Sequence, residues 1–151
     1  MRPDDEQIDA ILNQNTSAWA REQLGPGEPM DDRDYADFIS VTPDAVVAHV
    51  LAQGFHSEVV WTPELPPHAR EERIVVEPSE RGWEVCYSER GMRSDAATHP
   101  TYEGAVRDVV GRLFESAWTS LNHRYWHAHH PELPRLVPFG TPWPRPKRRR
   151  A

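Results

Sequence analysis

The chain has little of three things that define common protein classes: cysteine, long apolar runs and large aliphatic side chains. Cys86 is the only cysteine among 151 residues, so an internal disulfide is impossible. Its context, WEVCYS, is apolar, and we expect it to pack as a small hydrophobe. No stretch approaches the roughly 18 apolar residues of a membrane-spanning helix. The opening residues, MRPDDEQIDA, are acidic and not signal-like, so we expect a cytoplasmic protein with no membrane partner.

The shortage of aliphatic residues limits how much of the chain is expected to fold. Leu, Ile, Val and Phe together make up 29 of the 151 residues, a fraction close to that of disordered chains. Six Trp and four Tyr offset this shortage, because each aromatic ring buries a large area. We therefore predict one α+β domain over residues 1–130. Residues 131–151 are expected to form a proline-rich, basic tail that is either wrapped over the domain or disordered.

Basic residues are scarce in the first half of the chain. Residues 1–80 carry 17 acidic side chains and five Arg, whereas residues 81–144 carry seven of each sign. The last seven residues, RPKRRRA, add five positive charges to give the net charge of −7. A strongly acidic half repels nucleic acid and attracts a basic protein. The charge distribution therefore argues against a nucleic-acid partner.

Four stretches have helical features. Apolar residues recur at three- and four-residue steps over residues 4–23 and, most clearly, over residues 101–128. Residues 31–39 are expected to form one or two helical turns. Thr42 followed by proline is typical of a helix N-terminus, and Gly54 is typical of the position just past a helix end.

Strand signals concentrate in the middle of the chain. Residues 73–77 and 83–88 are rich in strand formers and predict a β-hairpin, with residues 78–82 as a five-residue loop. Short strands are also expected over residues 55–61 and 96–99. The predicted fold is thus α+β: N-terminal helices, and a small antiparallel sheet of two or three strands packed on the long C-terminal helix.

Four histidines near the end of the long helix are the strongest candidate for chemistry: His123, His127, His129 and His130. His123 and His127 are four residues apart, a spacing that places two zinc ligands on one helix face. The segment HRYWH lacks the glutamate of a zinc-protease motif, and histidines also suit a helix C-terminus. No nucleophile elbow, phosphate-binding glycine loop or dinucleotide fingerprint occurs. We expect no enzymatic activity and no cofactor, with a small histidine-dependent metal enzyme as the less favoured alternative.

Aromatic residues near the C-terminus divide into two groups. Trp118 and Tyr125 fall on the apolar stripe of the long helix and are expected in the core. Trp126 and Trp143 lie off or beyond that stripe, where exposed tryptophans are typical of protein interfaces. Phe139, which is flanked by proline, is expected to fold back over the domain together with Trp143.

The stretch GWEVCYSERGMRSD, followed by a helix that opens with an acid and an alanine, resembles immunity proteins of bacterial polymorphic toxins. Some of those proteins have a strand of the form W-x-V-x-Y-x-E-R-G. The matching residues here are Trp83, Val85, Tyr87, Glu89, Arg90, Gly91, Glu103 and Ala105. His99 and the proline after it depart from the pattern at a place where an aromatic residue is expected.

The resemblance implies a protein that binds a cognate toxin and blocks its active site without catalysing a reaction. The acidic first half is suited to a toxin with a basic catalytic cleft. Candidate contacts, chosen by charge and expected exposure, are Asp31, Asp32, Asp34, Glu89, Arg90 and Asp95. The alternative is a non-enzymatic interaction or adaptor module of phage or secretion origin.

Overall fold

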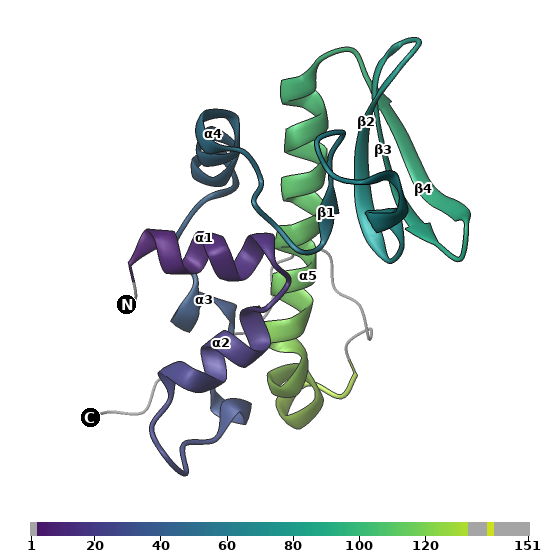
Figure 1. Ribbon diagram of the computed structural model, residues 1–151. Coiled ribbons are helices and arrows are strands. Elements are labelled where there is room, and N and C mark those ends of the chain that lie inside the picture. Colours follow the sequence, from purple (N-terminus) through teal and green to yellow (C-terminus); the bar gives the residue numbers. More distant parts are fainter. Residues whose placement is uncertain (1–2, 133–138, 141–151) are drawn as a thin grey trace. The chain divides into compact units, whose positions relative to one another are not determined.

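The computed structural model describes residues 3–132 and 139–140 of the chain (Figure 1). Its helices, four-stranded sheet and long final helix confirm the predicted α+β fold. In chain order the elements are α1 (Asp4–Leu12), α2 (Thr16–Gln23), the 3-10 helix η1 (Met30–Asp32), α3 (Tyr35–Phe38), α4 (Pro43–Gln53), β1 (Val60–Trp61), the 3-10 helix η2 (Pro67–Arg70), β2 (Arg73–Ser79), β3 (Gly82–Glu89), β4 (Met92–His99) and α5 (Tyr102–His129). None of the described helices combines the length and apolarity needed to cross a lipid bilayer.

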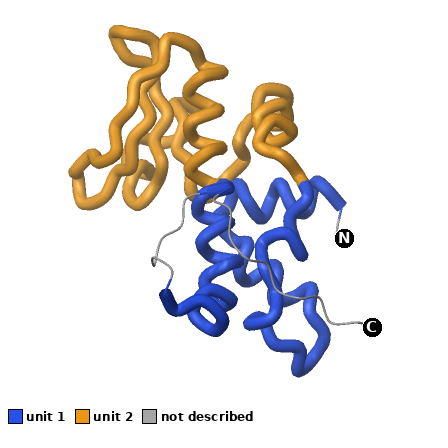
Figure 2. Tube along the Cα trace, turned by 180° about the vertical axis from the view of Figure 1, so that it is seen from behind, with its two compact units in different colours: residues 1–40, 114–151 blue, residues 41–113 orange. Residues whose placement is uncertain are grey.

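The chain divides into two compact units (Figure 2). The helical unit comprises residues 1–40 and 114–151, and the sheet unit comprises residues 41–113. The long helix α5 begins in the sheet unit and ends in the helical unit. The predicted tail comprises residues 131–151. The structure describes only residues 131–132 and 139–140 of it, and the rest lies outside the described residues.

The expectation of one continuous helix over residues 4–23 was wrong, because the chain breaks between α1 and α2. The Asn15 amide donates to the Ala10 carbonyl at 2.9 Å, and the Gln14 amide donates to the Ile11 carbonyl at 3.2 Å. This pair of bonds is a Schellman motif, and Gln14 takes the left-handed conformation that it requires, with φ 51°. The run NQN favours such an ending, since short polar side chains compete with helical hydrogen bonds.

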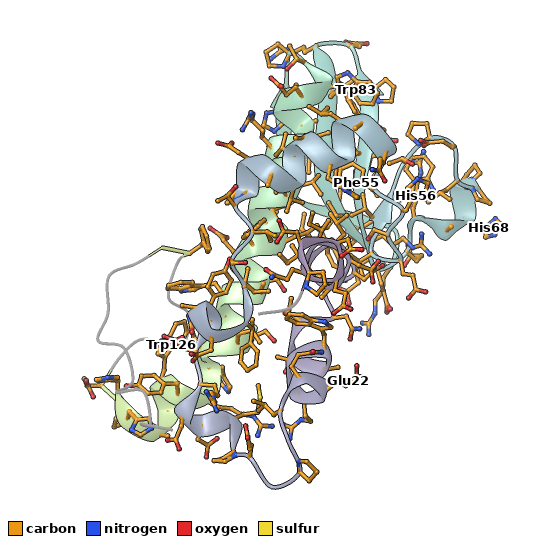
Figure 3. The ribbon with its side chains drawn as sticks, turned by 90° about the vertical axis from the view of Figure 1, so that its left-hand side faces the viewer. Glu22, Phe55, His56, His68, Trp83 and Trp126 are labelled. Atoms are coloured by element: carbon orange, nitrogen blue, oxygen red, sulfur yellow. The ribbon has the colours of Figure 1, made fainter. Side chains whose placement is uncertain are left out.

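The core of the helical unit includes an aromatic cluster on α5. Trp118, Tyr125 and Trp126 are all buried there, and Tyr35 of α3 packs against them. The expectation that Trp126 is an exposed interface residue was wrong: only 3% of its surface is accessible. The reason is tertiary, because α3 covers the side of α5 that the helical stripe alone leaves open. Figure 3 shows Trp126 on the lower part of α5.

A buried hydrogen bond fixes α3 to α5 within the same unit. The Tyr35 amide donates to Asn122 Oδ1 at 2.7 Å, and Asn122 has no accessible surface. Such a bond satisfies one of the amides that a helix N-terminus leaves unpaired. Phe139 lies over this cluster, with its ring 5.5 Å from that of Trp118 and 5.8 Å from that of Tyr35. Trp143, its predicted companion, lies outside the described residues.

The predicted helix ends in the sheet unit are confirmed. Thr42 Oγ1 accepts the Ala45 amide at 3.2 Å, and α4 begins at the proline between them. Gly54 follows the last residue of α4 and has φ 87°. The helix α5 begins in the same way, since the hydroxyl of the threonine before it accepts the Gly104 amide at 3.0 Å.

The sheet has the strand order β1-β2-β3-β4. The strands β2, β3 and β4 pair antiparallel, whereas the two-residue strand β1 pairs parallel with β2. The predicted third strand is confirmed and is longer than expected, because it begins at Met92. The predicted five-residue loop over residues 78–82 was wrong. Ser79 pairs with Gly82, so only two residues connect β2 and β3.

The sheet is buried on both faces near its centre. Ile74, Val76 and Val85 alternate along their strands with Val75 and Cys86, and all five side chains are buried. The second set packs with buried Trp61 beneath residues 62–72, the segment that contains η2. Because this segment covers the second face of the sheet, neither face of β3 is fully exposed to solvent, although its eight residues are of mixed polarity.

Three contacts join the strands to the first half of α5, which runs beside the sheet (Figure 1). The ring of Trp83 meets that of Tyr102 edge-on at 4.8 Å. His99 Nε2 lies 2.7 Å from Asp108 Oδ2, and Arg112 Nη2 donates to the carbonyl oxygen of Asp95 at 2.6 Å. The hairpins are therefore supported along their length by the helix.

Candidate partner-binding site

The tetrapeptide SERG occurs twice, at residues 79–82 and 88–91, and each copy closes one hairpin. The two turns lie at opposite ends of the sheet (Figure 1). In the first copy the serine pairs with the glycine, whereas in the second Glu89 pairs with Met92. The same four residues therefore form two turns of different register. The surroundings of each copy decide which register it adopts.

The first turn, between β2 and β3, is determined by close packing. Gly82 has φ 125°, and a Cβ built there would lie 2.4 Å from the carbonyl oxygen of His99. Only glycine can occupy that position without moving the backbone of the neighbouring strand. This turn is therefore a structural feature of the sheet.

The second turn, between β3 and β4, is a type I′ turn with an unusual residue. Arg90 and Gly91 have φ values of 52° and 74°, and a tight right-twisted hairpin requires positive φ at both central positions. Glycine adopts this conformation readily, whereas an arginine pays about 1–2 kcal/mol. Some other interaction must compensate for that cost.

Glu71 supplies the compensation. Its Oε2 accepts the Arg90 amide at 2.7 Å, and its Oε1 accepts the Gly91 amide at 2.9 Å. The Glu72 amide in turn donates to the Ser88 carbonyl at 2.8 Å, which ties the loop before β2 to the end of β3. One carboxylate therefore holds both amides of the turn and orders it.

The side chains around this turn face solvent. Glu89, Arg90, Gly91 and Met92 are all exposed, and 74% of the Met92 surface is accessible. An exposed methionine is a flexible apolar group that packs well against varied surfaces. Methionine and arginine are both enriched at protein interfaces, so Met92 and Arg90 suit this turn to such a contact. We call residues 88–92 the presented turn.

Asp95, the third candidate of this region, lies in a β-bulge of the edge strand β4. The register between β3 and β4 shifts there, and Asp95 has φ 53°. Its carbonyl oxygen accepts from Arg112 Nη2 at 2.6 Å, while the residue itself is exposed. Bulges at sheet edges redirect side chains and discourage further strand pairing. Asp95 is thus placed by α5.

A charged network crosses the sheet from β4 to η2. Arg93 donates to Glu84 at 2.7 Å and also bonds Glu77, which pairs with Arg70 at 3.1 Å. The guanidinium of Arg70 stacks over the Trp61 ring at 4.3 Å. Burial is the largest single influence on the pKa of Arg93 and works to lower it, but the hydrogen bonds to Glu77 and Glu84 and the negative charge of Glu77 together raise the pKa overall. The network ties the first residues of β4 to β2 and β3.

The acidic candidates Asp31, Asp32 and Asp34 lie in the helical unit and take three different positions. Asp31 is exposed, and Asp32 is partly exposed with its Oδ1 3.7 Å from His129 Nε2. Asp34 is 4% accessible and caps α3, where its amide donates to Asp37 Oδ2 at 2.9 Å in a capping box. Asp31 and Asp32 therefore remain accessible to a partner, while Asp34 serves the fold.

The histidine group does not converge. His123 and His127 lie on one face of α5, as expected, with ring centroids 4.3 Å apart. His129 and His130 turn instead toward the Tyr125 ring, at 4.5 and 5.7 Å. Within residues 3–132 and 139–140, no three His, Cys, Asp or Glu side chains lie close enough together to bind a metal ion.

Sequence reasoning singled out the presented turn and missed the residue that holds it. Glu71 is 19 residues from Arg90 in the chain and lies in the loop between η2 and β2. An acid in a loop gives no local signal, because its role depends on the pairing of β2 with β3.

Comparison of the chain with models of protein families, with curated proteins and with solved structures found no match.

Proposed function

We propose that this chain is a non-enzymatic inhibitor that binds a cognate protein toxin and blocks the toxin's active site. The observation that carries the proposal is the presented turn, in which Glu71 orders two exposed charged residues and an exposed methionine. A partner that binds a preformed turn does not have to order it, so more of the contact energy appears as affinity.

Charge supports a basic partner. The first 80 residues carry 17 acidic side chains and five Arg, and Asp31 and Asp32 are accessible among them. A basic catalytic cleft is attracted by such a surface, which speeds encounter at low salt. The resemblance of residues 83–91 to a strand of toxin immunity proteins points to the same class of partner.

The test is co-production with the protein encoded beside this chain. We expect that neighbour to contain a toxin domain, to arrest growth when produced alone, and to be neutralised by this chain in a one-to-one complex. Growth should resume without any change in the toxin's covalent structure, which mass spectrometry of the recovered complex measures. A neighbour that forms no complex, or a toxin that is chemically altered by this chain, contradicts the proposal.

A further inference from the structure

A pocket of about 540 Å³ lies within the helical unit, away from the presented turn in sequence. Its volume falls in the range of sites that enclose a ligand group, about 300–1,000 Å³. The side chains that give it chemical character are Trp19, Gln23, Glu28, Arg33, Asp37 and Phe38. They come from α2, from α3 and from the loop between them.

Two aromatic rings form the apolar part of this pocket. Trp19 and Phe38 are 8% and 6% accessible, so they are held firmly by the core of the unit. A cation placed against an aromatic face is attracted by the ring's quadrupole, most strongly by tryptophan. The rings thus favour a ligand that is both flat and positively charged, or one with an apolar stem.

The polar groups of the pocket are mainly acceptors. Glu28 and Asp37 contribute carboxylates, and Oδ2 of Asp37 already accepts the Asp34 amide in the capping box. Gln23 Nε2 donates to the Trp19 carbonyl at 2.9 Å, and its Oε1 is buried with no hydrogen-bond partner among the described residues. A buried acceptor without a donor is destabilising, because it has lost its hydrogen bond to water and gained none in return. A ligand that brings N–H groups into the pocket would relieve that cost once a movement of the Gln23 side chain exposes this oxygen.

The cation that already lines the pocket is weakly held. Arg33 Nη2 lies 3.4 Å from Glu28 Oε2, and the two side chains are 42% and 49% accessible. Exposed pairs of this kind contribute little to stability, so Arg33 can be displaced by a better-placed cation. The carboxylate of Glu28 then becomes available to the incoming group.

We propose that this pocket receives an arginine side chain of the protein partner. This inference rests on the proposed function and names one contact within it. A guanidinium is planar, stacks on aromatic rings and carries five donors, which match the carboxylates and the Gln23 acceptor better than an ammonium does. The surplus of acidic residues in the first half of the chain favours the approach of a basic surface.

The test uses the full chain, labelled with ¹⁵N, and N-acetyl-arginine amide as the probe at constant ionic strength. We expect the indole N–H of Trp19 and the side-chain amide of Gln23 to shift on titration. N-acetyl-citrulline amide, which has the same shape without the charge, should produce no comparable shift. N-acetyl-lysine amide should bind more weakly than the arginine probe.

Two pairs of variants separate a local contact from general electrostatics. Glu28→Gln should weaken arginine binding about two- to fivefold, the effect of one partly exposed charge. Glu22→Gln makes the same charge change at an exposed position of α2 outside the pocket lining (Figure 3) and should leave binding unchanged. Arg33→Gln should tighten binding, and the exposed Arg21→Gln should not.

Equal shifts with citrulline, equal effects of Glu28→Gln and Glu22→Gln, or tighter binding of lysine each overturn the inference. The probe experiment is independent of the toxin. A toxin complex that forms normally with Glu28→Gln and Arg33→Gln refutes the pocket and leaves the proposed function intact. Arginine binding without any toxin complex refutes the proposed function alone.

Discussion

Replacing Glu71 with glutamine tests how the presented turn is held. The carboxylate accepts two amides, at 2.7 and 2.9 Å, and both oxygens are needed. Glutamine has only one acceptor oxygen. Its NH₂ group is a donor, so it cannot accept the second backbone amide, which is also a donor. One hydrogen bond is therefore lost, and the other changes from charge-assisted to neutral. Because the site is exposed, we expect a loss of about 1 kcal/mol in the free energy of unfolding.

The local effect should be larger than the global one. Without Glu71, the Arg90 and Gly91 amides open to solvent more easily, and about 1 kcal/mol of lost protection corresponds to roughly fivefold faster hydrogen exchange. Urea denaturation measures the global change, and amide exchange followed by NMR measures the local one. The matched control is Glu72→Gln, an adjacent exposed acid whose carboxylate is not bonded to the turn. Equal exchange rates in the two variants would refute the role assigned to Glu71.

Three further predictions concern the fold. Gly82→Ala should cost at least about 3 kcal/mol in the free energy of unfolding, because the added Cβ would lie 2.4 Å from the backbone of the neighbouring strand. Gly91→Ala should cost only about 1–2 kcal/mol, because nothing lies near its Cβ and only the positive φ opposes it. Thermal denaturation compares the two variants, and equal losses would show that the two turns are equivalent. Trp126→Ala should cost about 3–5 kcal/mol by the same measurement, and a loss below 1 kcal/mol would mean that Trp126 is not in the core. Burial raises the pKa of the Cys86 thiol, so the unfolded chain loses this proton first as pH rises above about 8.5, and stability should fall there. A Cys86→Ala variant should lack that part of the pH dependence above about pH 8.5, and an unchanged slope would contradict it.

Periodicity and end signals predicted the helices well where local chemistry decides the outcome. The helix α5 begins and ends within one residue of the predicted range of 101–128, because its apolar stripe is long and Thr101 caps it. Thr42 and Gly54 likewise mark α4 by interactions with their own neighbours. In these cases the residues that decide the structure are close together in the chain.

Features that depend on distant contacts were not predictable. Two copies of SERG form turns of different register, because only one copy lies against the backbone after His99. Trp126 is buried by α3, whose position depends on the bond between Tyr35 and Asn122. Charge alone was enough to choose the candidate contacts. It could not predict that Asp34 is buried, because that burial follows from its role as the cap of α3.

The most direct test of the account compares the two SERG turns in binding to the cognate toxin. The double variant Glu89→Gln/Arg90→Gln neutralises the presented turn, and Glu80→Gln/Arg81→Gln makes the same change at the other end of the sheet. Calorimetry should show affinity about tenfold weaker for the first variant, roughly 1.4 kcal/mol, and unchanged affinity for the second. Equal affinities for both variants, or a greater loss at residues 80–81, would contradict the claim that residues 88–92 contact the partner.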